Sequence, residues 1–184
     1  MSSDVFIIST ARHPNAPVAI RQAVELAGLP VSRIQDAIFG SDGSPSFPDL
    51  DSITRTAGLA CPSVGVSSGL RALFFAADSV LCNDVELAVV TGLETDSSAA
   101  LVLASPEMVG RLNLLPRAHL AARSLAGPEP ALRLAGLAST DIEISKTGER
   151  GAALASELLD ELEAKSARWG LLSVGSAVLL LERI

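Results

Sequence analysis

Residues 65–80, GVSSGLRALFFAADSV, carry two serines and a glycine near their start and then become almost wholly apolar. Their spacing predicts a helix from about Ser67 to Leu81. A helix that is apolar on nearly every side is usually buried, so the fold has to enclose this one. Its first turn is therefore expected to point at a place that matters for function.

Short β-rich apolar runs alternate with helical segments around this helix. The continuous apolar run at 4–10 is typical of a parallel sheet that is covered on both faces. The first half reads β-α-β-α-β-α-β-β, and its last two strands are expected to pair antiparallel across a short polar turn. We predict strands at 4–10, 34–40, 62–66, 85–92 and 98–105, with further helices at 16–29 and 50–59.

The second half repeats parts of the first. AGLPVSRIQ at 27–35 is echoed by AGLASTDIE at 135–143, and DSSAALVLAS near residue 100 is echoed by VGSAVLLLER at the C-terminus. Two echoes in the same order favour duplicated α/β halves. The elements expected here are a strand or helix at 116–125, a helix at 128–137, a strand at 141–145, a helix at 149–165 and two closing strands around Gly175.

Composition narrows the class of protein. Hydrophobic residues make up 48% of the 184 residues and aromatic residues only 3%, so the core must consist of Ala, Val, Leu and Ile, which suits helices packed on a sheet. A net charge of −7 argues against binding to nucleic acid or anionic membranes. No apolar run is long enough to span a membrane, and the start MSSDVFII is unlike a secretory signal. Two cysteines make neither a disulfide framework nor a metal-ligand cluster. We expect a cytoplasmic, soluble protein without a cofactor or metal.

Several segments, in collinear order, resemble the thiolase superfamily. DVFIISTARHP is similar to the first thiolase strand, and SSGLRAL to the segment just after the nucleophilic cysteine. DSSAALVLASPEMVGRLNLLPRAHL, PEPALRLAGLASTDIEIS and LLDELEAKSARWGLLSVGSAVLLLERI resemble later thiolase segments, the last of them the final helix and hairpin. The resemblance implies a thiolase-like α/β fold layered α/β/α/β/α. Its two truncated, duplicated βαβαβαββ-type halves, residues 1–113 and 114–184, would have mixed sheets with helices between and outside them.

The residues that carry thiolase chemistry are missing from the matching positions. The resemblance places Val66 where thiolases have the cysteine that accepts the acyl group, and valine cannot form an acyl-enzyme. Glu149, within residues 148–151, replaces the activating histidine, and a carboxylate there would repel a developing oxyanion. Residues 173–175 replace the second cysteine. The excursion that covers coenzyme A in thiolases is reduced to a bare turn at 92–98. The chain therefore looks like a pseudo-thiolase with no catalytic residues.

Ser67, Ser68 and Gly69 remain as candidates for binding. The backbone N–H groups of a helix start could hold an anion or a carbonyl oxygen. In the other interpretation the serines only cap the buried helix. His13 and His119 lie in no recognisable triad pattern, so both are expected to be structural.

Two further features have structural interpretations. Cys61 is expected to be a small buried hydrophobe at the far end of the 62–66 strand. The acidic residues of the last helix, Glu157, Asp160, Glu161 and Glu163, are expected to form a solvated face.

The resemblance favours a non-catalytic, dimerising or accessory subunit associated with acyl-CoA and thiolase metabolism. In thiolase dimers the third strand pairs with its counterpart across a twofold axis, which implies an interface at Ser63, Val64, Gly65 and Val66. The partner would be a second copy, an active thiolase or a small acyl-CoA-binding protein. The alternative is an acyl-CoA- or acyl-thioester-binding protein, or an acyltransferase with altered chemistry, that uses the helix start at 67–69.

Overall fold

The computed structural model describes residues 4–41 and 47–184, in which nine strands and six α-helices alternate along the chain. The strands are β1 (Phe6–His13), β2 (Asp36–Ser41), β3 (Ser63–Val66), β4 (Leu87–Leu93), β5 (Ser98–Ala104), β6 (Ala118–Ser124), β7 (Ile144–Thr147), β8 (Trp169–Val174) and β9 (Ala177–Arg183). The helices are α1 (Ala16–Leu26), α2 (Leu50–Ala57), α3 (Gly69–Leu81), α4 (Pro106–Leu112), α5 (Pro128–Ala135) and α6 (Gly151–Ala164). The segment at 116–125, for which strand and helix were both open, contains the strand β6.

All nine strands form one mixed sheet in the order β3-β2-β4-β5-β1-β6-β9-β8-β7. β2 pairs parallel with β3 and β4, and β7 pairs parallel with β8. β4 and β5 pair antiparallel, as their short connection predicts. The two halves are joined where β1 meets β6, and there only Phe6 and Ile7 are paired, with His119 and Ala118. Separate sheets were expected for the two halves, but the structure joins them into one sheet through a short seam, the two residue pairs between β1 and β6.

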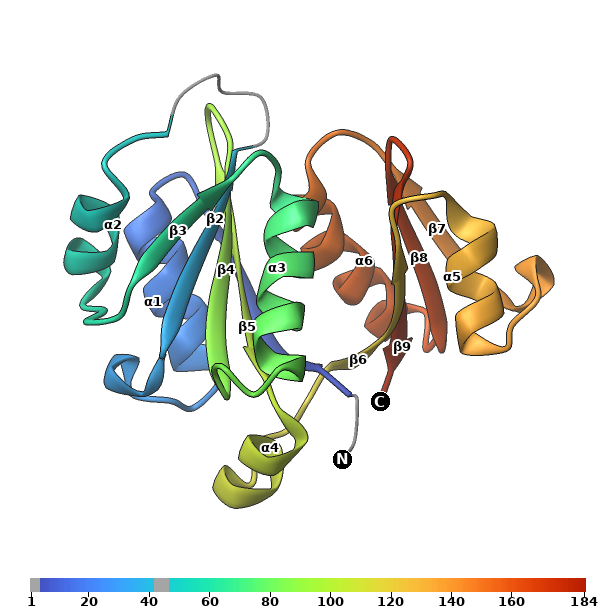
Figure 1. Ribbon diagram of the computed structural model, residues 1–184, viewed down its shortest axis with the longest axis horizontal. Coiled ribbons are helices and arrows are strands. Elements are labelled where there is room, and N and C mark those ends of the chain that lie inside the picture. The colour runs from blue at the N-terminus through green and yellow to red at the C-terminus, as the bar shows by residue number, and fades with distance from the viewer. Residues whose placement is uncertain (1–3, 42–46) are drawn as a thin grey trace.

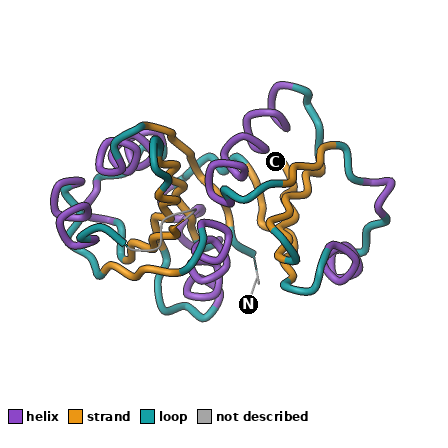
Figure 2. The backbone as a smooth tube through the Cα atoms, turned by 90° about the horizontal axis from the view of Figure 1, so that it is seen from above, coloured by secondary structure: helices purple, strands orange, loops and turns teal. Residues whose placement is uncertain are grey.

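Helices lie on both outer faces and between the two groups of strands (Figure 1). α1 and α2 cover the outer face of the first half, where Ile20, Val24 and Phe39 are buried in one cluster. α3 and α6 fill the centre, and their apolar residues form a single cluster with both groups of strands. α5 covers the outer face of the second half. Seen from above, the two groups of strands stand on either side of the central helices (Figure 2). The fold is thus mixed α/β, with helices between and outside the strands.

The two halves repeat the same sequence of elements. α1 and α5 both end in Ala-Gly-Leu, with Gly28 at φ 69° and Gly136 at φ 68°, and a short 3-10 helix then leads into β2 and β7. A left-handed conformation after a helix favours glycine, which explains why this residue recurs in both echoes. Among the described residues, no counterpart of α2 and β3 lies between β7 and α6. The expected boundary at 113/114 lies in the loop between α4 and β6.

Candidate functional site

The two central helices start side by side. A Cβ atom on Gly40, near the end of β2, would lie 2.4 Å from the Cα of Gly69, the first residue of α3. A Cβ atom on Gly151, the first residue of α6, would lie 2.3 Å from the nitrogen of Leu70. Both distances are far below van der Waals contact, so backbone packs on backbone at both places. Glycine is required there because any side chain would push the helices apart.

The serines at the start of α3 act as a helix cap. Ser68 is the N-cap residue, and its Oγ accepts a hydrogen bond of 3.3 Å from the N–H of Arg71. Ser67 is exposed, while Gly69 is buried beneath Gly40. The capping interpretation is therefore confirmed for Ser68. Because Ser68 occupies one N–H of the first turn and Gly151 covers another at Leu70, little of this helix start is open to an anion.

Both thiols lie away from the start of α3. Cys82 is the C-cap residue at the opposite end of the helix, about 20 Å away at 1.5 Å per residue over 13 residues. Cys61 precedes β3 at the opposite end of that strand from Val66 and packs against the outer cluster beneath α1 and α2. Burial, together with the nearby Asp36 carboxylate, raises the pKa of the Cys61 thiol. Neither sulfur therefore lies at the N-terminus of α3. The raised pKa of Cys61 also leaves less of this thiol in the nucleophilic thiolate form.

Neither histidine is placed to activate a group at the start of α3. His13 ends β1, which β4 and β5 separate from β2, and its Nδ1 accepts a hydrogen bond from the N–H of Asn15. His119 lies in β6, with Nε2 3.1 Å from an Asp4 oxygen and its ring 5.7 Å from that of Phe6. The structural role expected for both histidines is consistent with these local contacts.

Residues 148–151 lie beside the start of α3. Residues 148–151 lead directly into α6 and so reach the contact with Leu70. Glu149 is exposed, and Arg150 forms an ion pair with the Glu94 carboxylate at 2.9 Å. That carboxylate is 6% exposed and also accepts a hydrogen bond of 2.7 Å from Ser97. The turn between β4 and β5 is thereby tied to the start of α6.

A groove of about 680 Å³ runs along the open side of α3, beside the end of β6. Its walls are largely apolar, and Phe75 and Leu125 remain 43% and 60% exposed. Arg123, from β6, forms an ion pair with Asp78, from α3, across the groove. The lining residues are Val66, Ser67, Arg71, Phe74, Phe75, Asp78, Arg123, Ser124 and Leu125.

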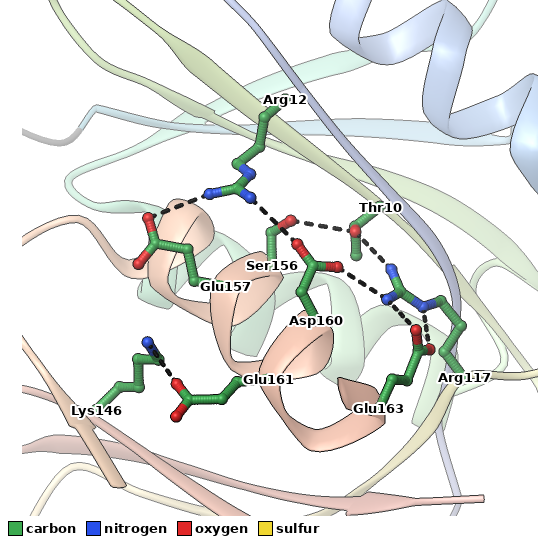
Figure 3. A network of polar contacts seen from close by, with 9 residues as sticks. All are labelled: Thr10, Arg12, Arg117, Lys146, Ser156, Glu157, Asp160, Glu161 and Glu163. Carbon is green, nitrogen blue, oxygen red and sulfur yellow. Dashed lines mark hydrogen bonds and ion pairs between the residues drawn. The ribbon is translucent and has the colours of Figure 1, made fainter. Parts of the chain in front are cut away.

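The acidic face of α6 is partly exposed and also forms ion pairs. Arg12 contacts Glu157 and Asp160, at 3.2 and 3.1 Å (Figure 3). Arg117 contacts Asp160 at 2.9 Å and Glu163 at 2.6 Å. The four carboxylates nevertheless keep 28–48% of their side chains exposed, so the face is solvated as predicted, and the ion pairs are what the sequence did not predict.

The same network continues into the interior. Arg117 donates a hydrogen bond of 2.8 Å to the hydroxyl of Thr10, which also accepts one of 3.1 Å from Ser156 (Figure 3). Ser156 is 1% exposed and Thr10 is 7% exposed. Lys146 and Lys165 contact Glu161 on the same helix. Sequence reasoning missed this network because its arginines, Arg12 in β1 and Arg117 just before β6, lie far along the chain from α6. The clue was the unusual placement of Arg12 and Arg117 in or beside apolar strand segments.

No protein-family model matches the chain, and no curated protein is significantly similar to it. In the described ranges, none of the helices combines the length and apolar character that crossing a membrane requires.

Proposed function

We propose that the chain is a non-catalytic, thiolase-like protein that acts as a dimerising or accessory subunit in acyl-CoA and thiolase metabolism. The observation that carries the proposal is which residues lie at the N-terminus of α3. The resemblance would align Val66 with the thiolase nucleophilic cysteine. At that point the chain has Val66, a serine cap and a glycine contact, while Cys61 and Cys82 lie at the opposite ends of their elements. The duplicated halves around two central helices agree with the proposed relationship.

The edge strand β3 supports the part of the proposal that concerns association. Among the strands of residues 4–41 and 47–184, β3 pairs only with β2, and no described strand pairs with its other edge. The N–H of Ala37 bonds to the carbonyl of Pro62 at 3.1 Å, and peptide groups alternate in direction along a strand. The backbone groups of Ser63 and Gly65 therefore point to the open edge, where a second strand can pair with them. Ser63, Val64, Gly65 and Val66 are all at least partly exposed.

The proposal is tested by the oligomeric state of the full chain. Sedimentation velocity is expected to show a concentration-dependent dimer. Ser63→Pro removes an N–H that points to the open edge but no hydrogen bond to β2, so it should give a folded monomer. An unchanged far-UV circular dichroism spectrum and a single cooperative unfolding transition would show that folding is intact, even though loss of the dimer and of the Ser63–Asp51 hydrogen bond lowers the melting temperature. A strict monomer at high concentration, combined with failure to bind an active thiolase or a small acyl-CoA-binding protein, would refute the role of a subunit.

The non-catalytic part needs a separate assay. Incubation with acetyl-CoA and acetoacetyl-CoA is expected to release no free CoA and to give no heat of binding by calorimetry. Binding or turnover that is lost on changing Ser67 would instead support the alternative, an acyl-thioester binder that uses the start of α3. The groove beside Ser67 gives that alternative room for a ligand, but the contact of Gly151 with Leu70 limits access to the helix N–H groups.

A further inference from the structure

α3 is buried except for one stripe of side chains. Of residues 71–78, only Arg71, Phe75 and Asp78 are exposed. They are spaced i, i+4 and i+7, so they follow one another on a single face of the helix. Phe75 is 43% exposed and the Asp78 side chain is 62% exposed. Arg71 forms no ion pair with an acidic side chain of the described residues, whereas Asp78 is paired with Arg123.

We propose that this stripe packs against the same stripe of a second copy, with the two α3 helices antiparallel about a twofold axis at Phe75. The inference rests on the proposed function, since β3 pairing supplies the axis. Phe75 lies four residues after Arg71 and three before Asp78. When two antiparallel stripes meet at Phe75, Arg71 of each copy faces Asp78 of the other. Arg71 then gains an acidic partner, and Asp78, already paired with Arg123, gains a second basic one.

The orientation of α3 relative to β3 agrees with one shared axis. β3 and β4 are both parallel to β2, so the intervening α3 runs antiparallel to them on the inner face of the sheet (Figure 1). A twofold axis that makes β3 antiparallel to its counterpart also makes the two α3 helices antiparallel, on the same face of the joined sheet. Edge strand and stripe would thus belong to one interface.

The pattern of charge points to a second copy as the occupant rather than to a different protein. A positive and a negative residue flank a central aromatic residue, so the stripe is complementary to itself when reversed. The groove adjoins this stripe, and its exposed Leu125 extends the apolar surface that the second copy would cover. Aromatic residues at the centre of an interface with charges around them are the usual arrangement in stable complexes.

The test uses two full-length variants with one reversed charge each. Arg71→Glu and Asp78→Lys homodimers would each place two like-charge contacts in the interface, so each should dimerise at least about tenfold more weakly than the wild type. An equimolar mixture of the two should restore dimers, because the heterodimer pairs Glu with Lys and Asp78 with Arg71. Arg133→Glu and Glu129→Lys, both exposed on α5, are the matched controls and should dimerise like the wild type.

The outcomes separate this inference from the proposed function. If the wild type dimerises and Ser63→Pro abolishes the dimer, but the charge variants and their mixture behave like the wild type, the stripe is not in the interface. If the wild type does not dimerise at all, the β3 interface fails too. Asp78→Lys places a second cation beside Arg123, so its melting temperature is measured first. If it does not fold, Asp78→Asn takes its place in the mixture, where one ion pair instead of two should restore part of the dimer.

Discussion

Gly151 and Leu70 lie backbone against backbone where the two central helices begin. A Cβ atom at position 151 would lie 2.3 Å from the nitrogen of Leu70 and 2.6 Å from its Cβ. Leu70 is fully buried, and each helix belongs to a different half of the chain. The packing of the halves therefore depends on the absence of a single side chain.

Gly151→Ala is expected to destabilise the protein by about 1–3 kcal/mol, because the added methyl group overlaps backbone that cannot move without shifting a helix. Gly110→Ala is the matched control. Gly110 lies inside α4 with open space where its Cβ would be, so alanine there should stabilise by about 0.5–1 kcal/mol. Urea unfolding of the two variants measures both effects. Equal stabilities of the two variants would contradict the contact.

Arg117→Gln should reduce the free energy of unfolding by about 1–3 kcal/mol, since it removes charged hydrogen bonds to Asp160, Glu163 and the buried Thr10 hydroxyl. Arg133→Gln, at an exposed site on α5, should change it by less than about 0.5 kcal/mol. Thermal and denaturant unfolding at moderate salt provide the comparison. A loss in Arg117→Gln no greater than that in the control would show that the network only neutralises surface charge.

The Glu161 carboxylate should titrate well below an ordinary glutamate. Hydrogen bonds from Lys146 and then Lys165 lower its pKa from 4.5 to about 2. Because the pKa is lower in the folded state, the stabilisation from Glu161 is fully present above pH 4.5 and is lost as the pH falls toward 2. Carbon-detected NMR titration of the side-chain carboxyl measures this value. Lys146→Met should raise the pKa more than Lys165→Met, and an equal or opposite ranking would overturn the assignment.

The two thiols should differ in reactivity. Cys82 is exposed, whereas Cys61 is half-buried and has a raised pKa, so less of it is thiolate near neutral pH. Labelling with iodoacetamide at pH 7.5, followed by peptide mass spectrometry, should modify Cys82 first. Cys82→Ser should leave a protein with no fast-reacting thiol. Rapid labelling of Cys61, especially if an acyl-CoA slowed it, would argue for a catalytic thiol and against the pseudoenzyme.

Much of the fold can be predicted from local patterns in the sequence. The Ala-Gly-Leu echoes at 27–29 and 135–137 predict two helix ends that turn into strands, and the structure confirms both. The apolar run of α3 predicts a buried helix, and the serine before it predicts its cap. These features succeed because each depends on residues within a few positions of one another.

The features that sequence reasoning missed depend on distant partners. The acidic face of α6 is solvated as its spacing predicts, but its ion pairs with Arg12 and Arg117 depend on residues far away along the chain. The segment at 116–125 was open between strand and helix, and its pairing with β1 and β9 makes it a strand whose buried residues alternate with half-buried ones. The groove beside Ser67 likewise forms from α3 and β6, whose juxtaposition no local pattern predicts.

The position of β1 at the seam has a consequence for biosynthesis. Phe6 lies opposite Ala104 of β5 on one side and opposite His119 of β6 on the other. This early strand therefore has no neighbour to pair with until more than half of the chain has been made. Contacts of such high sequence separation slow folding and leave an apolar strand exposed on the ribosome. Nascent chains arrested before residue 104 should accordingly depend on chaperones, and release from that dependence should coincide with the emergence of β5 and β6.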